Sequence, residues 1–269
     1  MSSIFEYSFL TNSVLAAVFA AISCGLAGTY IVSRRMVFVS GGITHASFGG
    51  IGIGYFAGIN PIIGAAIFSV LVAVGIERFS QKRIVRQDSI IAMLWSLGMA
   101  LGVIFIYITP GYAPNLMSYL FGSILTVSSL DIWLLGSLSL LSVLVFLLLY
   151  NSIIYVSFDE NYARTRNLPV QAIKYLMISL VALAIVFNIR VVGIILVLSL
   201  LTVPQSVANL FTRNYREILF LSVIIGLIGT FSGLVVSWWL NIPSGATIVF
   251  VLVLIFFLAS GLKRILRKF

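Results

Sequence analysis

Nine apolar stretches, each long enough to cross a lipid bilayer, dominate this sequence. A helix needs about 20 apolar residues to cross about 30 Å of hydrocarbon. Short polar segments or segments with glycine and proline separate the stretches. The stretches cover residues 11–32, 38–58, 61–79, 89–109, 131–156, 172–189, 191–209, 218–240 and 244–262. Backbone groups in lipid must form their hydrogen bonds within the protein, so the pattern predicts an all-α, polytopic transmembrane bundle of about nine spans. Eight spans are the alternative, because almost nothing joins the sixth and seventh stretches at 188–190.

Composition excludes the soluble classes. Hydrophobic residues make up 61% of the chain and charged residues 9%, whereas soluble domains carry about 25% charged residues. The net charge of +9 comes from basic residues in the short gaps between apolar runs. In a nucleic-acid-binding protein such residues would cluster on one solvent-exposed face. We therefore expect a lipid bilayer around the chain, a single transmembrane domain over 1–269, and no nucleic-acid partner.

The basic residues also predict an orientation. Lysine and arginine follow the first, third, fifth, seventh and ninth stretches, and of 16 basic residues only Arg190 lies in an intervening connection. Basic loops stay in the cytoplasm. The remaining 15 therefore place the N-terminus outside and the C-terminus in the cytoplasm, as a multi-pass membrane protein with nine spans requires.

The sequence contains none of the common enzymatic motifs. It has no G-x-x-x-x-G-K-[ST] loop for a nucleotide, no H-E-x-x-H, no G-x-S-x-G, and only one cysteine, Cys24. The glycines of 50–54 lack the strand and the acidic residue of a dinucleotide site. We therefore expect no enzyme activity and no stably bound cofactor, and any energy for transport must come from another chain.

His45 is the only histidine and lies in the polar, glycine-rich start of the second stretch, beside Thr44 and Ser47. Neutral imidazole binds zinc and other transition metals. Ionisable groups at membrane depth are functional candidates. His45 is therefore a candidate for a metal path, and the alternative is that it only bonds a neighbouring helix and packs.

Two further features concern helix packing. Glycines recur at four-residue spacing, as at Gly50 and Gly54 or Gly98 and Gly102. Such pairs let helix backbones approach closely, and the alternative is that the glycines of 49–58 line a path. Pro204 lies within the seventh stretch and predicts a helix kink, because proline removes one backbone donor.

The loop at 158–169 predicts a short helix outside the membrane. Acidic residues stand at its start, basic residues toward its end, and Pro169 prevents its continuation. Aromatic and aliphatic residues alternate with these charges, which favours a docking helix for a cytoplasmic partner over a solvated linker. The residues assigned to this contact are Phe158, Asp159, Glu160, Tyr162, Arg164, Arg166 and Leu168.

The order of these features resembles the permease subunit of the metal-ion ABC importers, which carry zinc, manganese or iron across bacterial membranes. Five segments match in order: 32–36 with the following 44–46; 88–98; 119–125; 158–164; and 191–193 through 203–204 to 241–245. The similarity covers about residues 11–262. The joint order and spacing are far more specific than any one segment.

The resemblance implies a homodimeric permease in the bacterial cell (inner) membrane, two cytoplasmic ABC ATPase subunits, and an extracytoplasmic metal-binding protein that delivers the ion. It implies a fold similar to the cobalamin and siderophore permeases, in which the acidic loop before a Leu-Pro is the coupling element. That element maps onto 158–169 here. Many members have an aspartate four residues before the histidine, where this chain has Gly41. Zinc is the cargo we expect first, with manganese and iron as alternatives.

Two other functions stay open at this point. A self-contained secondary transporter or channel would carry coupling ions on intramembrane acids, yet Glu6, Glu77 and Asp131 all lie near predicted span ends. A siderophore or cobalamin permease would have a longer chain and an extra N-terminal span. We therefore predict the ATP-driven metal importer.

Overall fold

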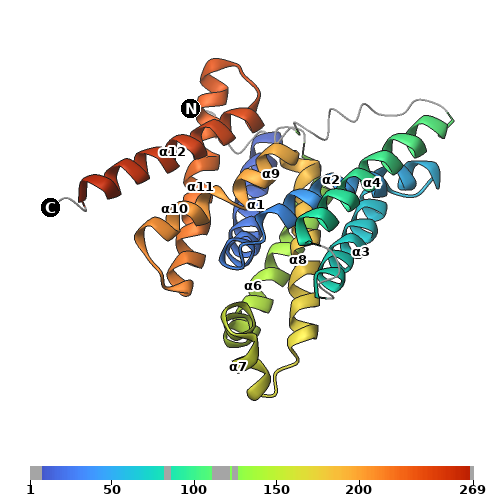
Figure 1. The fold of residues 1–269 in the computed structure, drawn as a ribbon. Coiled ribbons are helices and arrows are strands. Elements are labelled where there is room, and N and C mark those ends of the chain that lie inside the picture. The colour runs from blue at the N-terminus through green and yellow to red at the C-terminus, as the bar shows by residue number, and fades with distance from the viewer. Residues whose placement is uncertain (1–7, 82–85, 111–121, 123–126, 267–269) are drawn as a thin grey trace. The chain divides into compact units, whose positions relative to one another are not determined.

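Helices make up the regular structure of the part of the chain that the computed structural model describes, residues 8–81, 86–110, 122 and 127–266. Figure 1 shows them from the blue α1 to the red α12. They are α1 (Ser8–Ser33), α2 (Val37–Phe56), α3 (Pro61–Gln81), α4 (Gln87–Ile108), α6 (Ser129–Phe158), α7 (Glu160–Thr165), α8 (Val170–Val192), α9 (Ile194–Leu200), α10 (Val203–Phe211), α11 (Tyr215–Leu240) and α12 (Ser244–Leu266). No strand occurs within those residues, and the prediction of an all-α fold is confirmed.

The described helices include eight segments that are long and apolar enough to cross a membrane. They coincide with eight of the nine predicted stretches, and α9 with α10 form one of them. The remaining stretch, 38–58, forms α2, which carries hydroxyl groups, an imidazole and many glycines among its apolar residues. The predicted count of about nine spans, with eight as the alternative, therefore agrees with the structure.

The helices belong to two compact units. One unit contains α1 as far as Val32, α6 as far as Leu148, α8 from Asn188, and α9 to α12. The other contains α2, α3, α4, α7, the rest of α6, and α8 as far as Phe187. The single domain over 1–269 stays a prediction.

Glycines bring α2 into backbone contact with α3 and α4. A Cβ added at Gly50 would lie 2.4 Å from the carbonyl oxygen of Gly64 on α3, and one added at Gly52 would lie 2.6 Å from that of Gly102 on α4. No side chain fits into either space. Close packing, the first of the two interpretations of the repeated glycines, therefore explains Gly50 and Gly102.

The seventh stretch, where a kink was predicted at Pro204, is interrupted at 201–202, between α9 and α10. Helix α9 ends at Leu200, and Pro204 lies in the first turn of α10, where its missing N–H has no helical partner to lose. The buried Gln205 closes the break, because its Nε2 donates to the carbonyl oxygens of Leu200 and Cys24, each at 3.0 Å. This side chain ties the break to α1.

The connection between the sixth and seventh stretches is as short as predicted but lies at Gly193 and not at 188–190. Helix α8 continues through 188–190 to Val192, and Gly193 alone separates it from α9. Gly193 has a φ of 79°, a left-handed conformation that glycine adopts without the steric penalty of a side chain. The chain thus turns between two helices within one residue.

Candidate functional site

His45 is half-buried on α2, and its imidazole stacks on the indole of Trp95 from α4. The two ring centroids lie 4.1 Å apart and the ring planes differ by 4°. Metal ions bind imidazole nitrogens in the plane of the ring, so a stack on the face leaves the binding edge free. Trp95 therefore restricts the rotation of the ring without occupying its ligand positions.

The packing of α2 on α4 fixes the register of this pair. A Cβ at Gly98, which follows Trp95 on α4, would lie 2.5 Å from the Cα of Ala46, next to His45. A Cβ at Gly102 would lie 2.7 Å from the carbonyl oxygen of Phe48. Because the two backbones touch at both of these places, which follow the stacked pair on each helix, neither helix can slide along the other without separating the rings.

Thr44 and Ser47, which were predicted beside His45 on a metal path, are buried. The hydroxyl of Thr44 donates to the carbonyl oxygen of Ser40 at 2.6 Å, and that of Ser47 donates to Thr44 at 2.6 Å. Both bonds lie within α2. The structure thus gives these hydroxyls partners in their own helix, and their role on a metal path stays a prediction.

Gly41 lies one helical turn before His45, and the space beside it is open. A Cβ added at this position would meet no other atom within 4 Å. Residues four apart share a helix face. A carboxylate at position 41, as in many importer permeases, would therefore fit on the side of α2 that carries the imidazole.

A short helix is present where the 158–169 segment predicted one. Asp159 is the N-cap of α7 and accepts a hydrogen bond from the backbone N–H of Tyr162 at 2.9 Å. Arg164 lies in the last turn, and Arg166 is the C-cap. Carboxylates at the N-terminus and guanidinium groups at the C-terminus both stabilise a helix dipole. Asn167 then turns the chain with a φ of 55°.

Much of the apolar surface of this segment faces outward. Phe158 is 63% exposed and Tyr162 is 44% exposed. The ring of Tyr162 contacts that of Tyr155 edge-on at 5.1 Å, which fixes its direction. Leu168 is half-buried, and Ala163 packs inward. The segment therefore presents two aromatic side chains at an ordered position on the surface.

Sequence reasoning missed two buried ion pairs. It placed Glu77 and Asp131 near span ends, but the structure buries both. Glu77 pairs with Lys174 of α8 at 3.7 Å, and Asp131 pairs with Arg190 at 2.9 Å. The partners are far apart in sequence. The sequence indicates them only by a lysine or arginine within an apolar helix, and such a residue cannot be told from the basic residues that set the orientation in the membrane. For Arg190, the one basic residue in an intervening connection, the ion pair provides a specific partner.

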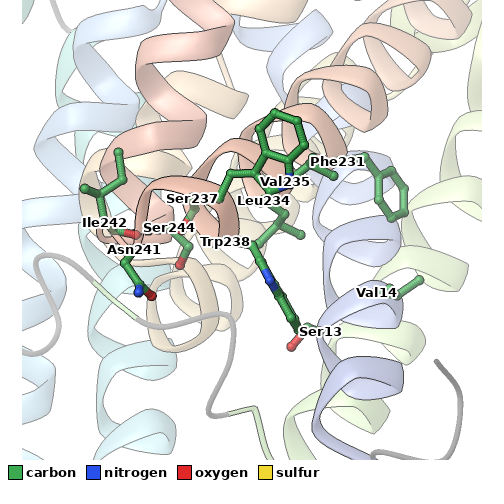
Figure 2. A pocket seen from close by; sticks show the side chains of 11 residues that line it. Ser13, Val14, Phe231, Leu234, Val235, Ser237, Trp238, Asn241, Ile242 and Ser244 are labelled. Carbon is green, nitrogen blue, oxygen red and sulfur yellow. Dashed lines mark hydrogen bonds between the residues drawn. The ribbon is translucent and has the colours of Figure 1, made fainter. Parts of the chain in front are cut away.

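A cavity of about 650 Å³ lies in the other unit, between α1 and the junction of α11 and α12. Figure 2 shows Trp238 and Asn241 among the side chains that line it. Its lining contains no histidine, cysteine or acidic residue. In the described part of the chain no group of three such residues could hold a metal ion.

Comparisons with known proteins agree with this arrangement. The model of the ABC 3 transport family matches residues 6–263. An uncharacterized membrane protein of Synechocystis is 38% identical over 96% of this chain and 92% of its own length. A manganese transport system membrane protein of Halalkalibacterium halodurans is 35% identical over 94% and 87%.

A solved structure is also similar. PsaBC from Streptococcus pneumoniae, in complex with a Fab, superposes with a TM-score of 0.85 and 28% identity, covering 95% of this chain and 92% of that one. The resemblance to importer permeases is thereby confirmed, and the chain is a transporter subunit and not an enzyme. It belongs to the ABC 3 transport family.

Proposed function

We propose that the chain is the permease subunit of an ATP-driven importer of divalent metal ions, and that the ion passes the imidazole edge of His45. The observation that carries this proposal is the His45–Trp95 stack, which holds one imidazole of α2 in a fixed direction. An orientated neutral imidazole with a free edge is a suitable transient ligand for a transition-metal ion.

The cargo is a divalent transition metal. Relatives from Halalkalibacterium halodurans and Listeria are named for manganese transport, and one from Chlamydia pneumoniae is named for metal transport. These names support manganese as the first ion to test, ahead of the zinc that the sequence suggested, with iron as the third. Imidazole binds all three ions, so a comparison of uptake must decide between them.

The energy for transport reaches the permease through contacts with other chains. The sequence contains no nucleotide loop, and the 158–169 segment presents Phe158, the last residue of α6, and Tyr162 of α7 at the surface. We propose that the 158–169 segment is the contact with a cytoplasmic ABC ATPase. The full importer then contains a permease homodimer, two ATPase subunits and an extracytoplasmic metal-binding protein.

A self-contained secondary transporter is the other candidate, and the buried acids weigh against it. Such a transporter uses intramembrane carboxylates to hold its coupling ion. The two buried acids among the described residues, Glu77 and Asp131, are each paired with a cation of the protein. Neither carboxylate is therefore available to hold a coupling ion in this structure.

We expect His45→Ala to reduce metal uptake by about tenfold or more, because even the residues that only support a metal ligand commonly contribute 10–100-fold. Uptake of Mn²⁺, Zn²⁺ and Fe²⁺ is measured in cells that express the complete importer. The matched control is Gly75→Ala, where an added Cβ meets no atom within 4 Å. Wild-type uptake by a normally expressed His45→Ala variant would show that the ion does not depend on this imidazole.

The double variant Tyr162→Ala with Arg166→Glu should remain folded but lose the ATPase during purification. Truncating an aromatic anchor at an interface costs about 2 kcal/mol, or about thirtyfold in affinity. The control variant, Tyr107→Ala with Arg264→Glu, makes the same changes at exposed positions elsewhere. If both variants retain the ATPase and full uptake, the contact lies elsewhere on the permease.

The orientation rests on the basic loops. We propose an external N-terminus and a cytoplasmic C-terminus. A cysteine at Asn60 or Ile242 should react with a membrane-impermeant thiol reagent in intact cells, and one at Asn167 or Asn214 only after permeabilisation. The reverse pattern would place α7 outside and remove its proposed contact with the ATPase.

A further inference from the structure

Four charged side chains meet beside α7, and we call them the α7 charge network. Arg34 lies between α1 and α2, Glu77 near the end of α3, Glu160 at the start of α7, and Lys174 in α8. Lys174 Nζ contacts Glu160 Oε1 and lies 3.7 Å from Glu77 Oε1. Arg34 Nη2 lies 3.4 Å from the same oxygen of Glu160. Two cations and two carboxylates cancel in formal charge.

The centre of the network is buried. The side chain of Lys174 is 6% exposed and that of Glu77 is 7% exposed. A charged group that is shielded from water needs an oppositely charged partner, since an unpaired buried charge costs much free energy. Gln81 extends the contact, because its Nε2 donates to Glu77 at 3.1 Å and to Gln171 at 2.9 Å. The ends of α3 and α8 are therefore held to each other by charge and hydrogen bonds.

Glu160 connects this centre to the surface. It is the first residue of α7, and its side chain is 36% exposed. Its carboxylate contacts Lys174 and Arg34 while Phe158 and Tyr162 of the same segment stay exposed. The segment thus has an exposed aromatic side and a charged contact with α8 and the α1–α2 connection.

Simpler roles fit the network less well. A metal site would need free carboxylates, but Glu77 and Glu160 are each bound to a cation of the protein. A docking contact would need access to Lys174, which is buried. Stability alone is a weak reason for buried charges, because well-packed apolar residues commonly do as well.

We propose that the α7 charge network is the link that carries a displacement of α7 to α3 and α8, with Lys174 as its central positioning residue. The inference rests on the proposed contact of α7 with the ATPase. Buried ion pairs resist separation more than apolar surfaces resist sliding, so α7 cannot shift without moving the helices that share its charges. The contact of Arg34 with Glu160 extends the link to the start of α2, the helix that carries His45.

The test uses the complete importer in liposomes, with ATPase and external metal-binding protein present. The variants are Glu160→Gln, Lys174→Gln, their combination, and Lys174→Arg. The readout is the number of metal ions transported per ATP hydrolysed, which a merely structural role would not change in a folded complex. The control is Asp88→Asn, which removes an exposed carboxylate at the start of α4.

We expect each glutamine variant to transport about tenfold fewer ions per ATP, within the range that residues linking two sites commonly show. The losses in the combination should be less than additive, because both variants remove the contact of Lys174 with Glu160. Lys174→Arg should restore most of the ratio because it keeps the charge. The ATPase should still co-purify, since the exposed side of α7 is intact.

An unchanged ratio in a folded Glu160→Gln variant would overturn the inference, as would additive losses in the combination. Loss of the ATPase from Glu160→Gln would also overturn it, by making this residue a docking contact. If Lys174→Gln does not fold, the more exposed Glu160→Gln and the conservative Lys174→Arg still decide the question. Failure of the wild-type complex to transport any of the three metals would contradict the proposed function itself.

Discussion

Backbone contact along both sides of α2 is the constraint on which the candidate site depends. Gly50 touches α3 and Gly52 touches α4 with no side chain between the helices. Packing through small residues replaces the hydrophobic driving force that lipid removes. It also explains why α2 carries so many glycines, because much of its surface lies directly against protein.

The same packing positions the side chains of the candidate site. Ala46 against Gly98 sets α2 and α4 in one register, and the neighbouring His45 and Trp95 then stack. Elsewhere in the unit that contains α2, α3, α4 and α7, the ion pair of Lys174 and Glu160 joins α8 to α7. A side chain suited to a metal ion and a surface segment suited to a partner protein are thus both attached to rigid helices.

The sequence predicts what depends on local patterns. Hydropathy located the spans, and the acidic start and basic end of 158–169 predicted α7, whose N-cap is Asp159. Partners distant in sequence could not be predicted. Trp95 meets His45 only through the α2–α4 register, and Lys174 finds Glu77 only after α3 and α8 pack together. The break before Pro204 likewise depends on Gln205 reaching Cys24 on α1.

The central claim is that the metal ion meets the free edge of His45, and Trp95 supplies the most direct test. Replacing the other three tryptophans, Trp133, Trp238 and Trp239, by phenylalanine leaves one indole stacked on the imidazole. Titration of the purified importer with Mn²⁺, a paramagnetic ion, should quench this fluorescence in a saturable way, whereas Mg²⁺ should not. His45→Gln should abolish the quenching. Equal quenching in the protein with His45 and in the His45→Gln variant would contradict the account. So would a lack of quenching in an importer that transports Mn²⁺.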